Sequence, residues 1–191
     1  MTANIHIDNQ AEPKFCRPRT TPYALTEKVN LEIDRLERSG IIKPVEFSDW
    51  ESPIVSVVKP DGSMRLCGDY KVTINRVTKV DKHPIPRIRD ILSTLSGGKS
   101  FTKLDLAHAY QQVPLEEESQ KLTTINTPKG LYQYTRLPFG ISSAPAIFQR
   151  VVETLLEGVS NVSVYINDIL VTGRTQEEHL QNLQEVLSRL E

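Results

Sequence analysis

The feature that most constrains the fold is a polar turn between two short β-branched runs in the last third of the chain. The runs are Asn161-Val162-Ser163-Val164 and Ile169-Leu170-Val171, and Tyr165-Ile166-Asn167-Asp168 lies between them. β-Branched residues favour strands, and Asn and Asp tolerate the backbone angles of tight turns. The segment therefore predicts a β-hairpin that turns at Asn167-Asp168. A hairpin of this kind needs no role beyond reversing the chain.

A second acid gives the hairpin a chemical interpretation. Asp105 ends the apolar, strand-like run Phe101-Thr102-Lys103-Leu104-Asp105-Leu106. A carboxylate beside an apolar strand is costly to bury unless it binds something. A sheet can bring a strand-end acid and an acid in a hairpin turn together around metal ions, and carboxylate oxygens are the ligands that Mg²⁺ prefers. Asp105 and Asp168 are therefore candidate metal ligands, and Asn167 stands beside them with a neutral amide.

Hydrophobic spacing predicts helices and strands in an α+β arrangement. One helix is expected to begin at a Thr26 cap, to bury an apolar stripe of Val29, Ile33 and Leu36, and to end at Gly40. Further helices are expected from Pro86, from Ser142 or Ser143 to Gly158, and after the capping box Thr175–Glu178. Strands Ile54–Val58 and Met64–Cys67 are expected to pair around the turn Lys59–Gly62. Strands Leu122–Ile125 and Leu131–Tyr134 are expected to pair around Pro128–Gly130, and one more strand ends at Asp105. The last helix is predicted to bury Leu180, Leu183, Leu187 and Leu190. The helix from Pro86 is predicted to use Ile88, Ile91, Leu92 and Leu95.

Composition excludes several classes of protein. The chain is 38% hydrophobic and 25% charged, an ordinary globular mixture. It has two cysteines, no run long enough to span a membrane and no signal peptide, so an intracellular, cytoplasmic location is expected. A net charge of −1 argues against a dedicated nucleic-acid binder.

A local excess of cations lies between Arg76 and Lys103. The cations there are Lys79, Lys82, Arg87, Arg89 and Lys99, against the acids Asp81 and Asp90. Such a stretch can follow a phosphate backbone, or it can simply be the solvated face of a helix.

Five blocks, in order, resemble the reverse transcriptases of gypsy-type LTR retrotransposons. The blocks are Lys59–Gly62 with Arg65–Tyr70, His83–Pro86, Leu104–Tyr110, Leu137–Gln149 and Tyr165–Asp168. The last resembles a Tyr-x-Asp-Asp hairpin in which Asn167 replaces the first Asp. Retroviral enzymes usually carry Gln where this chain has Phe139, which favours the gypsy-type elements.

The resemblance implies the fingers and palm of a right-handed polymerase with an antiparallel palm sheet packed on helices. It assigns 1–21 to an extended N-terminal segment, 22–104 mainly to fingers and 105–191 mainly to palm, interleaved, with thumb and RNase H regions absent. The chain would be a fragment of a longer polyprotein or a truncated gene copy. Its partners would be an RNA or DNA template–primer and deoxynucleoside triphosphates, with no membrane.

The resemblance also assigns roles to individual residues. Asp105 and Asp168 would bind Mg²⁺, or Mn²⁺ in its place, with Asn167 at the third catalytic position. The expected nucleotide-binding residues are Lys59, Arg65, Tyr110, Phe139 and Gly140. The expected template or primer contacts are Gln149, Tyr165, Arg87 and Arg89. Alternatively, Lys59 and Arg65 only solvate a hairpin and Tyr110 is a core tyrosine.

Two functions of different classes follow. The first is template-directed DNA synthesis by two-metal nucleotidyl transfer, weakened because Asn167 removes one negative charge from the metal site. The second is a non-catalytic relic or a module that binds template–primer.

Overall fold

The computed structural model describes residues 1–190 and divides them into two compact units, each made of two separate stretches of sequence. Unit 1 contains Met1–Val80 and Tyr110–Ala144, and unit 2 contains Asp81–Ala109 and the residues from Pro145 onward. Each unit has its own sheet, with mainly antiparallel pairing, together with helices. The predicted α+β class is confirmed.

Unit 1 is built on a five-stranded sheet of order β1-β6-β5-β2-β3. Pairing is antiparallel except between β2 and β5, which run parallel. The strands are β1 (Ile42–Val45), β2 (Ser52–Val58), β3 (Met64–Gly68), β5 (Ile125–Thr127) and β6 (Gly130–Tyr134). The helices are α1 (Tyr23–Arg38), α3 (Glu117–Leu122) and the short 3₁₀ turns η1 (Tyr70–Val72), η2 (Ile74–Arg76) and η3 (Ala109–Gln112, whose first residue belongs to unit 2).

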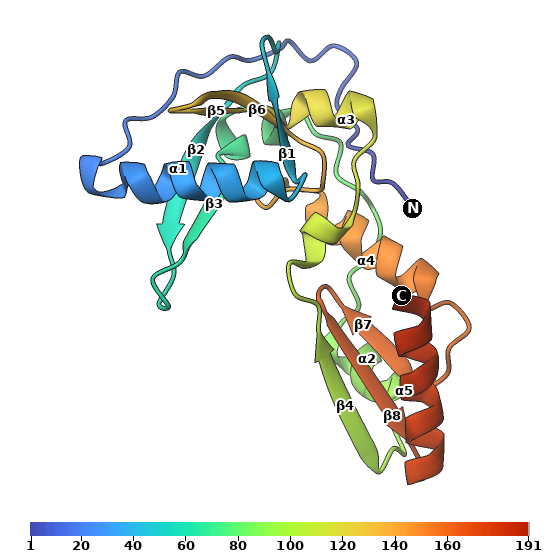
Figure 1. The fold of residues 1–191 in the computed structure, drawn as a ribbon. Coiled ribbons are helices and arrows are strands. Elements are labelled where there is room, and N and C mark those ends of the chain that lie inside the picture. Colours follow the sequence, from blue (N-terminus) through green and yellow to red (C-terminus); the bar gives the residue numbers. More distant parts are fainter. Residues whose placement is uncertain (191) are drawn as a thin grey trace. The chain divides into compact units, whose positions relative to one another are not determined.

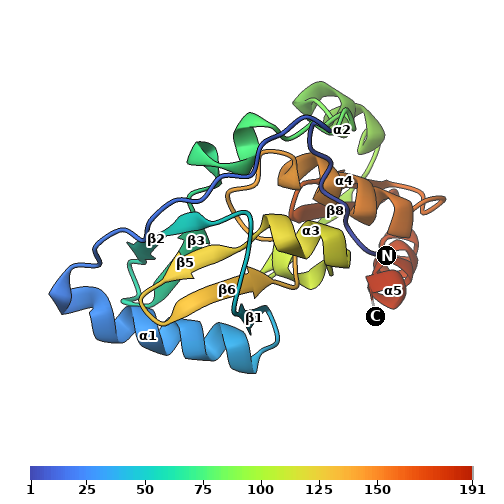
Figure 2. The ribbon, with the colours of Figure 1, turned by 90° about the horizontal axis from the view of Figure 1, so that it is seen from above.

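Helix α1 lies against β1 and β3 (Figure 2). Its apolar stripe of Val29, Ile33 and Leu36 is buried, as the spacing predicts. The helix begins at Tyr23 rather than at a Thr26 cap, because the preceding Pro22 is extended and the Thr26 hydroxyl donates to the Pro22 carbonyl at 3.4 Å.

The segment before α1 runs extended along unit 1. It forms bridges from Ala3 to Leu115, from Ile7 to Thr78 and from Phe15 to Glu51. Ala3 and Ile5 are 1% and 4% exposed. Backbone hydrogen bonds therefore hold a stretch whose sequence contains little apolar patterning.

The second predicted hairpin of unit 1 is shorter than expected. Leu122 is the last residue of α3, and the strand begins only at Ile125, pairing with β6 around the Thr127–Gly130 turn. The three residues before Ile125 were predicted to be part of the strand. Instead, the Thr123 and Thr124 hydroxyls donate to the Gln120 and Lys121 carbonyls at the end of α3.

Unit 2 contains a three-stranded antiparallel sheet of order β4-β8-β7 (Figure 1). The strands are β4 (Ser100–Asp105), β7 (Val162–Tyr165) and β8 (Asp168–Gly173). The helices are α2 (Ile88–Thr94), α4 (Ala144–Leu155, whose first residue belongs to unit 1) and α5 (Gln176–Leu190).

Helix α5 packs on β8 with a different face from the predicted one. His179 and Val186 are buried, whereas Leu180 and Leu187 are 54% and 47% exposed. The His179 ring lies under β4, with Nε2 2.9 Å from the Thr102 hydroxyl, and this contact sets the rotation of the helix. Half of the predicted capping box is present, since the Thr175 hydroxyl accepts a hydrogen bond from the Glu178 amide at 3.2 Å. The Glu178 carboxylate accepts from the Arg174 amide at 2.7 Å.

The predicted stripe of α2 is only half correct. Ile91 and Leu95 are buried, but Ile88 and Leu92 are 71% and 64% exposed because the helix has only seven residues and buries a narrow face.

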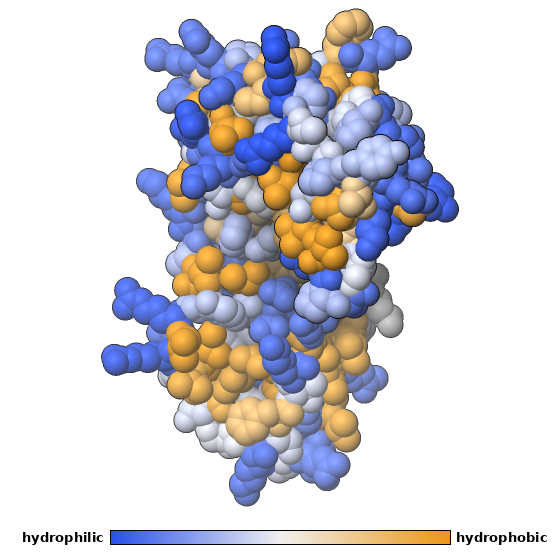
Figure 3. Space-filling view, turned by 90° about the vertical axis from the view of Figure 1, so that its left-hand side faces the viewer, coloured by the Kyte–Doolittle hydropathy of each residue, from blue (hydrophilic) through white to orange (hydrophobic). Residues whose placement is uncertain are grey.

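On the face drawn in Figure 3, hydrophobic and hydrophilic side chains are interspersed. Within residues 1–190, no helix has the length and apolar character needed to cross a membrane.

Two neighbouring residues of α5 test the orientation of this helix. Val186→Ala should lower the free energy of unfolding by about 2 kcal/mol, because it leaves a cavity under the sheet. Leu187→Ala should cost less than about 1 kcal/mol, since that side chain is half exposed. Urea denaturation of both variants would measure this difference, and a larger loss for Leu187→Ala would contradict the observed packing.

Candidate active site

The hairpin β7–β8 turns one residue earlier than predicted. Tyr165 pairs with Asp168, so the two-residue loop is Ile166-Asn167 and Asp168 is the first residue of β8. Ile166 has φ 54°. A positive φ at the first loop position is usual for glycine, and holding a β-branched residue there costs about 1–3 kcal/mol.

The register between β4 and β8 brings the two predicted metal ligands together. Asp105 and Asp168 are direct partners across the strands, and the Leu106 amide donates to the Asn167 carbonyl at 3.0 Å. Side chains of directly opposite residues lie on the same face of a sheet. Asp105 is exposed and the Asp168 side chain is 28% exposed. Both carboxylates are thus open to solvent on one face of unit 2.

Each carboxylate already has a donor from this chain. Asn167 Nδ2 donates to Asp105 Oδ1 at 3.3 Å, and Lys103 Nζ lies 2.9 Å from Asp168 Oδ2. The hydrogen bond with Asp168 raises the pKa of Lys103, and the charge of Asp105 adds to this effect. Sequence reasoning did not assign Lys103 to the site. Strand alternation could have done so, because Lys103 precedes Asp105 by two positions and shares its face.

The carboxylates satisfy a minimal requirement for magnesium. Within residues 1–190 there is no group of three or more His, Cys, Asp or Glu side chains placed to hold a metal. Mg²⁺ is nevertheless commonly bound by one or two carboxylates together with water and substrate phosphates. Asp105 and Asp168 fit that donor set. Asn167 can add a neutral oxygen only if its amide turns away from Asp105.

A second group of predicted residues meets in unit 1. The Arg65 guanidinium carbon lies 5.1 Å from the centre of the Phe139 ring, a cation–π distance. The Tyr110 and Phe139 rings are 5.1 Å apart between centres and tilted by 46°. Burial raises the pKa of the Tyr110 hydroxyl. Strand β3, η3 and the loop before α4 thus place a cation and two rings together.

The loop that carries Phe139 is fixed at Gly140 and Asn75. Gly140 has φ 97°, and a Cβ there would lie 3.0 Å from the Gly68 carbonyl oxygen, so a larger residue would be both strained and tightly packed. Asn75 Nδ2 donates to the Gly140 carbonyl at 2.7 Å, and Asn75 Oδ1 accepts from the Ser142 amide at 2.9 Å. Asn75 was missed, because a single Asn in a short polar stretch carries no local signal.

The other predicted residues do not join these groups. Lys59 is half-buried, and its amide donates to the Ser63 carbonyl at the β2–β3 turn. Arg87 and Arg89 are exposed at the beginning of α2, and Tyr165 is 40% exposed. Gln149 is fully buried in unit 2 with its amide group hydrogen-bonded, so its side chain is not accessible to a template.

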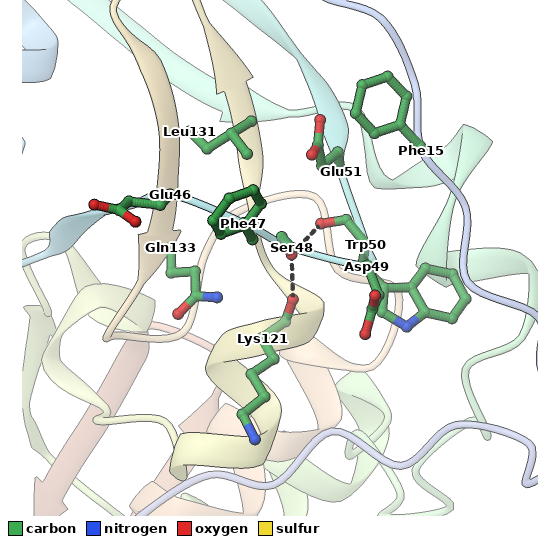
Figure 4. Close-up of a pocket in the computed structure, with 10 residues that line it drawn as sticks. All are labelled: Phe15, Glu46, Phe47, Ser48, Asp49, Trp50, Glu51, Lys121, Leu131 and Gln133. Atoms are coloured by element: carbon green, nitrogen blue, oxygen red, sulfur yellow. Dashed lines mark hydrogen bonds between the residues drawn. The ribbon is translucent and has the colours of Figure 1, made fainter.

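A separate pocket of about 710 Å³ lies in unit 1 (Figure 4). Phe47 projects into it, and Ser48 donates to the Trp50 carbonyl at 2.8 Å. Glu51, which is buried at the wall, has a raised pKa because of desolvation. The residues that line the pocket include none of the predicted catalytic or nucleotide-binding side chains.

Comparison with known proteins identifies relatives along almost the whole chain. The family model described as reverse transcriptase (RNA-dependent DNA polymerase) matches residues 57–191. An uncharacterised protein of Caenorhabditis elegans is 39% identical over 189 residues, which are 98% of this chain and 15% of that protein. The retrovirus-related Pol polyprotein from transposon opus of Drosophila melanogaster is 38% identical over 189 residues, 95% of this chain and 19% of the polyprotein.

Solved structures agree with the sequence relatives. The foamy viral protease-reverse transcriptase in complex with an RNA/DNA hybrid has a TM-score of 0.85 and 28% identity, over 96% of this chain and 25% of that one. The chain spans less than a fifth of the length of the two relatives above. The gypsy-type subgroup stays a prediction. With a family match over more than half of its residues, the chain belongs to the reverse transcriptase (RNA-dependent DNA polymerase) family and has its fingers and palm fold.

Proposed function

We propose that this chain is the fingers and palm portion of a retrotransposon polyprotein that extends a primer on an RNA or DNA template with deoxynucleoside triphosphates. The observation that supports this most directly is the register of β4 and β8, which sets Asp105 opposite Asp168 on an open face. Unit 1 would supply the fingers and unit 2 the palm. The solved relatives with RNA/DNA hybrid and with double-stranded DNA support nucleic acid as the partner.

Each group of residues has a part in this proposal. Asp105 and Asp168 would hold Mg²⁺, or Mn²⁺ in its place, and the bound metal would activate the primer hydroxyl and stabilise charge on the phosphates. Arg65 and Lys59 would bind the triphosphate through charge-assisted hydrogen bonds. Tyr110 would occupy the space of a 2′-hydroxyl and so exclude ribonucleotides, while Phe139 and Gly140 would line the nucleotide pocket.

Asn167 should weaken this activity. The neutral side chain leaves the site one negative charge short of three carboxylates, and its amide nitrogen points at Asp105. Less negative charge means weaker attraction for divalent cations and less compensation of their mutual repulsion. The barrier should rise by several kcal/mol, where each ~1.4 kcal/mol is a factor of ten in rate.

A non-catalytic relic or a template–primer binding module is the second candidate. The observation that favours it is that each carboxylate already has one partner within the chain, Asn167 for Asp105 and Lys103 for Asp168. A metal at Asp168 would be repelled by the neighbouring Lys103 ammonium, which lies 2.9 Å from Asp168 Oδ2. This arrangement would let the protein fold with a stable, metal-free surface.

Asn167→Asp tests the metal site directly. Asn and Asp have nearly the same shape, so the substitution should keep the turn and add one charged ligand. Without metal the variant should melt slightly lower, because three acids repel. With Mg²⁺ it should melt higher than the native chain, since binding to the folded state stabilises by about 2.7 kcal/mol at 100 times the Kd. Thermal melts with and without Mg²⁺ measure both effects.

Primer extension on an RNA template gives the functional part of the same test. With the thumb region of a relative fused to the C-terminus, Asn167→Asp should increase extension by ~100-fold or more. Gln181→Glu, on the exposed side of α5, adds the same charge elsewhere in unit 2 and should change neither readout. If Asn167→Asp behaves like Gln181→Glu, Asn167 is not at a metal site and the relic is the better account.

Tyr110 can be tested through sugar selectivity. In the Asn167→Asp background, Tyr110→Ala should raise ribonucleotide relative to deoxynucleotide incorporation by about 10- to 100-fold, because it opens the space next to Phe139. Tyr110→Phe keeps the ring and should keep the selectivity. Single-nucleotide extension assays compare the two, and unchanged selectivity in Tyr110→Ala would remove the steric role.

Template–primer binding should be weak and dependent on salt, because the net charge is −1. Changing both Arg87 and Arg89 to Glu should weaken binding further. If each arginine contacts one phosphate, the slope of log K against log salt concentration should become less steep by about two. Lys28→Glu with Arg38→Glu, on α1, makes the same change of charge for comparison. Fluorescence anisotropy at several salt concentrations measures the slopes, and equal effects of the two pairs would show that α2 has no special role.

A further inference from the structure

Gln149 is a fully buried amide whose two ends are both used inside unit 2. Its Oε1 accepts a hydrogen bond from the Ile166 amide at 2.6 Å. Its Nε2 donates to the Val164 carbonyl at 2.8 Å and to Glu153 Oε1 at 2.6 Å. A donor on one side and two acceptors on the other fix the orientation of the amide. Helix α4 is thereby connected to both the end of β7 and the turn that follows.

The residue that Gln149 holds is the strained one. Ile166 has φ 54°, a conformation that β-branched side chains rarely adopt, and it directly precedes Asn167 and Asp168. Such a conformation persists only where surrounding contacts determine it. The hydrogen bond from the Ile166 amide supplies one of these contacts. It replaces the glycine that a turn of this kind normally requires.

Two further side chains hold Gln149 in place. Glu153 lies one helical turn after Gln149 on α4, and its other oxygen, Oε2, is 2.5 Å from His83 Nε2. The backbone at His83 is itself fixed, since its amide donates to Asp81 Oδ1 at 2.9 Å and Asp81 pairs with Arg150 of α4 at 2.8 Å. The chain of contacts therefore runs from His83 through Glu153 and Gln149 to the turn.

We propose that Gln149 is a positioning residue, oriented by Glu153 and His83, that holds the Ile166-Asn167 turn in its strained form and so sets where Asn167 and Asp168 stand. Only the importance of this position for catalysis rests on the proposed function. The role of Gln149 in holding the conformation of the turn does not depend on catalysis, so it can be measured even if the chain is inactive.

A double-mutant cycle between Gln149 and Ile166 tests the role. Gln149→Met keeps an unbranched side chain of similar size but removes both hydrogen-bonding ends. In the native background it should lower the melting temperature clearly. In an Ile166→Gly background the loss should be much smaller, because glycine adopts a positive φ without being held. Equal losses in the two backgrounds would overturn the proposal, since they would show that Gln149 is an ordinary buried amide.

Amide hydrogen exchange supplies a local readout. In Gln149→Met, exchange at the Ile166 amide should become at least tenfold faster. The exchange rate of the Val171 amide, in the middle of β8, should change only as much as the overall stability of the protein changes. Gln133→Met makes the same substitution at a position that is 8% exposed in β6 of unit 1 and should leave Ile166 exchange unchanged. Unchanged Ile166 exchange in Gln149→Met would contradict the proposal.

A variant that fails to fold still gives an answer. If Gln149→Met folds only together with Ile166→Gly, the proposal is supported. If it folds in neither background, Glu153→Leu decides, because it removes one of the two acceptors for Gln149 Nε2 at a partly exposed position and should accelerate Ile166 exchange several-fold. No acceleration there would overturn the proposal. Primer extension is not needed for any of these outcomes, so a failure of the proposed polymerase activity would be recognised separately.

Discussion

The antiparallel register between β4 and β8 is the constraint on which the functional surface depends. A shift of one residue would turn Asp105 and Lys103 towards α5 and bring Leu104 to the open face. The buried residues Ile169 and Val171, together with the His179 contact to Thr102, make such a shift costly. The packing of the apolar face of the sheet therefore determines which polar side chains stand on the open face. Like charges placed opposite each other destabilise a sheet, and Lys103 and Asn167 offset this for the two acids.

Local chemistry in the sequence was enough to predict much of the fold. The β2–β3 hairpin, the buried stripe of α1 and the strand ending at Asp105 follow from turn residues and periodicity, and the structure has all three. The face of α5 that is buried could not be predicted in this way. Its leucines have helical spacing, but the contact between His179 and β4 selects another face, and a contact between distant segments leaves no local pattern.

The candidate site was also predicted only in part. The two acids could be paired because each stands at the end of a strand-like run. The turn was placed one residue late, because Asn-Asp is the better turn sequence, whereas in the structure Ile166 stands at the first loop position with its amide hydrogen-bonded to Gln149. Asn75 and Lys103 were missed for different reasons. Lys103 follows from strand alternation, whereas the contacts of Asn75 with Gly140 and Ser142 depend on residues more than 60 positions away.

The interleaving of the two units affects how the chain must fold. Strand β4 precedes its partner β8 by a long stretch of sequence, with Asp105 and Asn167 separated by 62 residues, and residues 110–144 of that stretch belong to the other unit. Pairing across such a distance carries a loop-closure cost and is slow compared with forming the local β7–β8 hairpin. During synthesis β4 emerges first and has no neighbour until β8 follows. With no partner on either edge, and with the exposed Phe101 on it, β4 makes the polypeptide prone to aggregation during this interval.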